Sequence, residues 1–125
     1  MDAPEAIATL ENLGEIYSSQ GNYTEAEPLL SRVLEIKERK LGPDYLEVAN
    51  SVSRLALLYY CETKYNAAEP LYKRALQIRK KNLGPRDPIV LQTMEFYAAL
   101  LRQEGRKAEA QEIETQAGEN RANNP

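Results

Sequence analysis

Apolar residues recur along the chain at the spacing of a helix face. Leu10, Leu13 and Tyr17 lie three and four positions apart. Because one face of an α-helix returns every 3.6 residues, this spacing predicts an amphipathic helix. The pattern continues and predicts six helices, arranged as three hairpins. We expect the first helices of the hairpins at about 4–20, 46–62 and 88–104, and the second helices at about 23–40, 65–82 and 107–117.

The three hairpins are copies of one sequence unit. The tripeptide Leu41-Gly42-Pro43 returns 42 positions later as Leu83-Gly84-Pro85. The same shift superimposes residues of both helices, among them Leu13 on Leu55, Tyr17 on Tyr59, Tyr23 on Tyr65 and Ala26 on Ala68. A weaker third copy follows. Residues 1–117 are therefore predicted to form one domain, with repeats at about 2–42, 43–84 and 85–117.

Capping residues mark the expected helix ends. Asp87 precedes a proline, which predicts an N-cap followed by proline in the first turn. Asp2 and Asp44 are available near the corresponding starts of the other two first helices. Gly42 and Gly84 supply the left-handed backbone that ends a helix, and the proline after each prevents continuation.

The third unit is more polar than the first two. Lys107 and Glu114 stand where the first unit has Tyr23 and Leu30. A further hairpin would not cover so polar a helix, and stacks of repeats need a polar outer face at their ends. We therefore expect this helix to cap the stack and the polar tail 118–125 to fray.

The repeated residues resemble the tetratricopeptide repeat. The resemblance lies in Leu13-Gly14, Tyr17, Gly21, Tyr23 and Ala26, with a copy in Leu55-Ala56, Tyr59, Tyr65 and Ala68. The period of 42 residues, longer than the usual 34, is similar to that of kinesin light chain-like repeats. The resemblance implies an all-α fold, a right-handed α-solenoid of three tetratricopeptide-type hairpins whose first helices line a concave groove.

The resemblance also implies that this groove binds a peptide or a partner protein. The groove positions of the repeat correspond here to Glu11, Asn12, Glu15, Asn50, Ser53, Arg54, Leu57, Tyr60, Gln92, Glu95, Phe96 and Arg102. Leu57, Tyr60 and Phe96 have the composition of contact anchors, although packing against a neighbouring unit is an equal alternative for Tyr60 and Phe96. Glu11, Glu15 and Glu95 favour a ligand with basic residues at one end, and Arg54 and Arg102 could pair with an acidic side chain elsewhere in the ligand. The equal alternative is that these charges are simply solvated.

Two ligand preferences of related repeats do not transfer. Chaperone-binding members hold a C-terminal carboxylate with cations and amides, but this chain has Glu11 and Glu15 at two of those positions. Two carboxylates would repel such a ligand, so no carboxylate-clamp activity is expected. In kinesin light chains a series of asparagines lines the groove. Arg54 and Phe96 interrupt the series that Asn12 would begin.

Composition argues against other classes of function. The net charge of −3 gives no general attraction for nucleic acid or anionic membranes. The basic runs 37–40 and 79–81 fall at the ends of second helices, where cations offset the helix dipole. Without histidine or a glycine-rich phosphate loop, we expect no enzyme activity, cofactor or metal. Cys61, the single cysteine, forms no intrachain disulfide, which favours a reducing, cytoplasmic location.

The sequence therefore predicts a non-catalytic adaptor or scaffold that binds a protein or peptide. One alternative is a structural segment that associates with itself through its end repeats. Another is a regulatory part of a larger multidomain protein.

Overall fold

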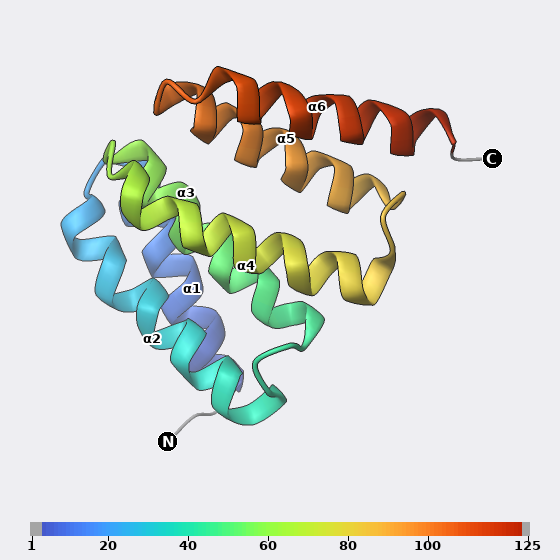
Figure 1. Ribbon diagram of the computed structural model, residues 1–125. Coiled ribbons are helices and arrows are strands. Elements are labelled where there is room, and N and C mark those ends of the chain that lie inside the picture. The colour runs from blue at the N-terminus through green and yellow to red at the C-terminus, as the bar shows by residue number, and fades with distance from the viewer. Residues whose placement is uncertain (1–3, 124–125) are drawn as a thin grey trace.

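A computed structural model describes residues 4–123, which form six helices in three successive hairpins (Figure 1). The helices are α1 (Pro4–Ser19), α2 (Tyr23–Leu41), α3 (Leu46–Cys61), α4 (Tyr65–Leu83), α5 (Pro88–Gln103) and α6 (Lys107–Ala122). Each second helix packs on its own first helix, and α2 and α4 also pack on the first helix of the next hairpin. The predicted all-helical stack of hairpins is confirmed. Within residues 4–123, no helix is long and apolar enough to cross a membrane.

Five helices end within one residue of the predicted positions, but α6 does not. The helix passes through Gly118 and ends at Ala122, so the predicted end at 117 and the predicted fraying of 118–122 are wrong. Ala117 is buried against α5 in a small apolar cluster. Beyond it, Arg86 donates a hydrogen bond to the backbone oxygen of Asn123 (2.7 Å). These contacts come from the preceding helix and its turn, and residues 124–125 lie outside the described part.

Of the four capping residues that lie within residues 4–123, three are found at the expected helix ends. The Asp87 side chain accepts a hydrogen bond from the Ile89 backbone N–H (2.9 Å), as an N-cap should. At α3 the N-cap position is Tyr45, and the carboxylate of Asp44 instead lies 3.4 Å from Lys81 Nζ. Asp2 lies outside the described residues. Gly42 and Gly84 do end α2 and α4, with φ of 95° and 88°.

Small residues allow the helices of each hairpin to approach closely. Ala26, Ala68 and Ala110 lie at the same position of the three second helices, and all are fully buried. Gly14 has the same function in α1, since a Cβ there would lie only 2.8 Å from Leu30 Cδ2. The larger apolar side chains then fill the space between consecutive hairpins.

The outer face of α1 is uncovered, which the apolar pattern did not predict. Leu13 and Ile16 are exposed, whereas Leu55 and Leu58, their equivalents in α3, are buried against the first hairpin. No hairpin precedes α1 within the described residues. The same sequence position is therefore core in one layer and surface in another.

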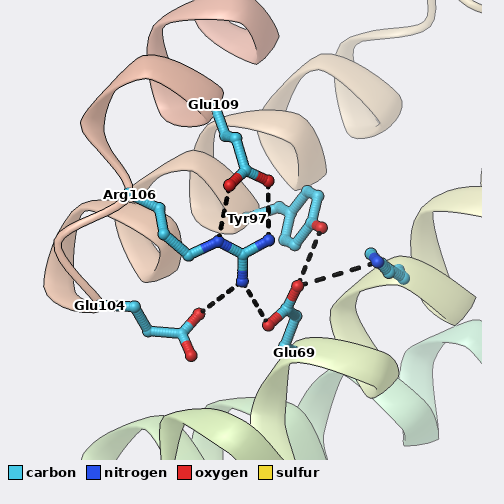
Figure 2. Close-up of polar contacts among 6 residues, drawn as sticks. Glu69, Tyr97, Glu104, Arg106 and Glu109 are labelled. Atoms are coloured by element: carbon cyan, nitrogen blue, oxygen red, sulfur yellow. Dashed lines mark hydrogen bonds and ion pairs between the residues drawn. The ribbon is translucent and has the colours of Figure 1, made fainter.

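A polar cluster joins the second and third hairpins (Figure 2). Arg106, at the turn before α6, donates hydrogen bonds to Glu69 of α4 (2.8 Å), to Glu104 (3.4 Å) and to Glu109 (2.7 and 2.8 Å). The Tyr97 hydroxyl donates to the other oxygen of Glu69 (3.4 Å). Burial, followed by the charge of Glu69, raises the pKa of Tyr97 to about 12. Glu69 thus receives donors from α5 and from the turn that leads to α6.

Candidate functional site: the groove along the first helices

Two hollows lie along the side of the stack that the first helices form. The first hollow, about 510 Å³, is lined by Ile7, Ala8, Glu11, Lys37, Lys40, Leu41, Glu47, Asn50 and Arg54. The second hollow, about 200 Å³, is lined by Ser53, Arg54, Leu57, Tyr72, Arg79, Gln92, Thr93 and Phe96. Arg54 borders both. Their lining residues come from all three hairpins, and we refer to the two hollows together as the groove.

The packing of the helices explains the walls and floor of the groove. First helices pack mainly on second helices and not on one another, so gaps remain between α1 and α3 and between α3 and α5. Residues of α2 line the gap between α1 and α3, and residues of α4 line the gap between α3 and α5. Lys37 and Leu41 therefore reach the first hollow, and Tyr72 and Arg79 reach the second.

Seven of the twelve residues predicted for the site line one of the two hollows. They are Glu11, Asn50, Ser53, Arg54, Leu57, Gln92 and Phe96. The other five lie elsewhere: Asn12, Glu15, Tyr60, Glu95 and Arg102. Of these, Glu15 remains next to the groove because it pairs with Arg54.

Three charged residues at the first hollow, Glu11, Lys37 and Arg54, are paired within the protein. Arg54 Nη1 donates to Glu11 Oε2 (2.6 Å), and Arg54 Nε lies 2.7 Å from Glu15 Oε1. Lys37 Nζ donates to the same oxygen of Glu11 (3.1 Å). A basic ligand would have to compete with these internal cations. The expected attraction of Glu11 and Glu15 for basic residues is therefore largely neutralised.

Two further predicted charges pair with α6. Arg102 forms an ion pair with Glu114, and this contact lowers the pKa of the Glu114 carboxyl. Glu95 lies 3.2 Å from Arg121. Both pairs join α6 to α5. The resemblance to the repeat predicts instead that Arg102 and Glu95 contact a ligand.

The second hollow combines exposed apolar side chains with a half-buried cation. Leu57 is 49% exposed and Phe96 is 48% exposed, although both belong to well-packed helices. Beneath them, Arg79 donates to Asn50 Oδ1 (3.0 Å) and to Thr93 Oγ1 (2.9 Å). Burial lowers the pKa of Arg79 and raises that of Tyr72 to about 12.

The two aromatic candidates differ in their surroundings. Tyr60 is half-buried, packs against the cluster between the second and third hairpins, and makes an edge-to-face contact with Tyr65 at 5.5 Å. These contacts favour the packing alternative for Tyr60. Phe96 stays exposed at the rim of the second hollow.

The sequence did not lead us to predict the residues of the second helices that line the groove, among them Lys37, Tyr72 and Arg79. The basic runs that contain Lys37 and Arg79 suggest from sequence only cations that offset the helix dipole. A usable signal existed, because the positions equivalent to Lys37 in the later repeats are Arg79 and Arg121, all cationic. A charge kept at one register of three helices suggests a shared contact on the first helices.

Within residues 4–123, no three His, Cys, Asp or Glu side chains are grouped to hold a metal ion. Cys61 is an exposed free thiol. What the groove does present is apolar surface, hydrogen-bonding groups and charge.

The chain belongs to the tetratricopeptide repeat family. The profile of the Tetratricopeptide repeat matches residues 5–81 and again residues 48–121. Such repeats generally form protein-interaction modules and are typically non-catalytic. The comparison with curated proteins gives no match.

Solved structures with the same fold are kinesin light chain-like. BtubC (BKLC) from P. vanneervenii is 28% identical with a TM-score of 0.86, over 96% of this chain and 48% of that one. A putative kinesin light chain from Podosopora anserina, with nearly identical TPR-like repeats, is 24% identical with a TM-score of 0.82, over 98% of this chain and 58% of that one. The latter likeness shows the fold alone. This chain spans about half the length of these structures.

Proposed function

We propose that the groove binds an extended segment of a partner protein and that the chain acts as a non-catalytic, cytoplasmic adaptor. The observation that supports this most is the exposure of Leu57 and Phe96 at the second hollow. Apolar anchors surrounded by polar groups are the usual composition of a binding hot spot. The helices that carry them are held by buried packing, so little ordering entropy is lost on binding.

The apolar face of α1 favours a second function, self-association. Leu13 and Ile16 are exposed there, and their equivalents in α3 are covered by a helix. The opposite end of the stack carries the polar residues of α6. Head-to-tail growth is therefore disfavoured, and two copies would meet through their α1 faces in an isologous contact.

One set of variants separates these two functions. A phage-displayed random peptide library is selected on the wild-type chain, and the affinities of the selected peptides are measured. Leu57→Ala and Phe96→Ala should each weaken binding about 10-fold or more if the groove is the site. Ile16→Ala is the control for peptide binding, because Ile16 is equally exposed but lines neither hollow.

Self-association is measured on the same variants by sedimentation velocity over a range of concentrations. If α1 is the contact, the dimer should weaken in Ile16→Ala and persist in Phe96→Ala. Peptide capture that is indifferent to both groove substitutions would contradict the proposed binding function.

A further inference from the structure

One charge pair of the repeat is incomplete in the middle layer. In the first hairpin, Lys37 Nζ lies 3.1 Å from Glu11. In the third, Arg121 occupies the equivalent position and lies 3.2 Å from Glu95, the equivalent of Glu11. In the second hairpin the cation is Arg79, but the position of the glutamate is occupied by a serine, Ser53.

Arg79 has only neutral partners in the described residues. Its guanidinium donates to the oxygens of Asn50 (3.0 Å) and Thr93 (2.9 Å). The hydroxyl of Thr93 gives its own proton to the backbone oxygen of Ile89 (2.7 Å), so it can only accept from Arg79. A guanidinium has five N–H groups, and these two contacts leave most of them available.

The surroundings of Arg79 add no negative charge. Arg79 and Ser53 both line the second hollow, and the lining of that hollow contains a second cation, Arg54, and no acidic side chain. The first hollow, by contrast, is bordered by Glu11 and Glu47. The charge of Arg54 is taken up by Glu11 and Glu15, whereas that of Arg79 is not compensated by a carboxylate.

We infer that the second hollow receives an acidic side chain of the bound peptide, an aspartate or glutamate, whose carboxylate pairs with Arg79. The ligand's carboxylate takes the place that Glu11 and Glu95 occupy in the outer layers. This inference rests on the proposed peptide-binding function and specifies its ligand. A carboxylate suits the planar guanidinium because it can accept two parallel hydrogen bonds.

The half-buried position of Arg79 makes this contact selective. A cation that has already lost part of its hydration, and that binds only neutral oxygens, has more to gain from a carboxylate than a fully solvated one. Hydrogen bonds to charged groups are strong enough to change affinity about 10- to 100-fold. We expect an effect of that size when the acidic residue of the peptide is made neutral.

The test uses peptides selected from a phage-displayed random library in which the C-terminus is fused to the coat protein. Selected sequences are then synthesised with an acetylated N-terminus and an amidated C-terminus, each beside a copy with Asp→Asn or Glu→Gln. Affinities are measured by fluorescence anisotropy for wild type, Arg79→Gln, Ser53→Glu and Arg121→Gln.

Ser53→Glu is the most informative variant. Both other layers carry glutamate at this position, so the backbone accommodates it, and the new carboxylate should pair with Arg79 in place of the ligand. Acidic peptides should then bind about 10- to 100-fold more weakly, and Arg79→Gln should have the same effect. Arg121→Gln is the matched control, because it removes an equivalent cation that does not line the hollow. Circular dichroism verifies that each variant is folded.

The outcomes distinguish this inference from the proposed function. Enrichment of acidic residues, lost with Ser53→Glu, supports both. Peptides that need Leu57 and Phe96 but show no acidic preference would overturn the inference and leave the groove function standing. If no peptide is captured at all, both proposals fail.

Discussion

Leu13 and Leu55 occupy the same position of successive hairpins, yet Leu13 is 38% exposed and Leu55 only 6%. Leu55 belongs to the same buried cluster as Leu30 and Leu34 of α2. The equivalent surface of α1 has no preceding helix within residues 4–123. The location of a layer in the stack therefore decides whether its apolar face is core.

The first prediction concerns these two leucines. Leu55→Ala should lower the free energy of unfolding by about 2–5 kcal/mol, because it removes buried contacts and leaves a cavity. Leu13→Ala should cost about 1 kcal/mol or less, since the side chain is partly solvated already. Urea denaturation followed by circular dichroism measures both. Equal losses would mean that Leu13 is covered in solution.

The second prediction concerns the start of α5. Asp87→Ala removes the side-chain acceptor for the Ile89 N–H and should lower the free energy of unfolding by about 0.5–2 kcal/mol. Asp44→Ala is the control, because Asp44 precedes α3 without capping it. Its cost should be about 0.5 kcal/mol or less. Thermal unfolding of both variants checks the difference, and a larger loss for Asp44→Ala would contradict the assignment of the caps.

The third prediction is a loss of stability at alkaline pH. The folded protein holds the pKa of Tyr59, Tyr72 and Tyr97 at about 12, through a hydrogen bond to Glu27 for Tyr59 and through burial for the other two. The unfolded value is about 10. Since the folded state keeps these protons longer, their contribution is complete below about pH 10 and is lost as the pH rises toward about 12.

Ultraviolet absorbance titration of the tyrosines, with and without denaturant, measures this effect. The native chain should show a late-titrating group that vanishes on unfolding. Tyr72→Phe should reduce both the late absorbance and the slope of stability against pH. Tyrosines that all titrate near pH 10 in the native chain would refute the expected pH dependence.

The fourth prediction concerns the cluster in Figure 2. Arg106→Gln should lower the melting temperature, because Arg106 joins α4 to the last hairpin through Glu69. The loss should be larger at low salt, since ions screen partly exposed charges. Lys64→Gln is the control, as Lys64 is the equivalent residue one repeat earlier and pairs with Glu62 at 3.4 Å. An equal, salt-independent effect of both changes would argue against the cluster as a link between hairpins.

Local sequence signals predicted the bounds of five of the six described helices accurately. Glycine ends α2 and α4 and aspartate caps α5, because these residues act on the nearest backbone groups. Helical periodicity and the 42-residue repeat bounded the remaining two of these five helices to within one residue. The end of α6 lacked such a signal. Its last turns are held by non-local contacts, such as Arg121 with Glu95 and Arg86 with the Asn123 backbone, which no local pattern reveals.

The candidate site was predicted in part for a related reason. The resemblance to the tetratricopeptide repeat supplied the groove positions of the first helices, among them Leu57, Phe96 and Arg54. It does not show which residues of a second helix reach between two first helices. Arg79 was missed because its place in the groove depends on the spacing between α3 and α5.

By itself, the sequence determined the hairpins, their period of 42 residues and the equivalence of positions between layers. These follow from backbone hydrogen bonds and apolar spacing within short segments of chain. Only the tertiary structure decided which equivalent residues are covered and which charges are paired. Leu13 differs from Leu55, and Arg79 from Arg121, because burial and ion pairing depend on neighbours supplied by other helices.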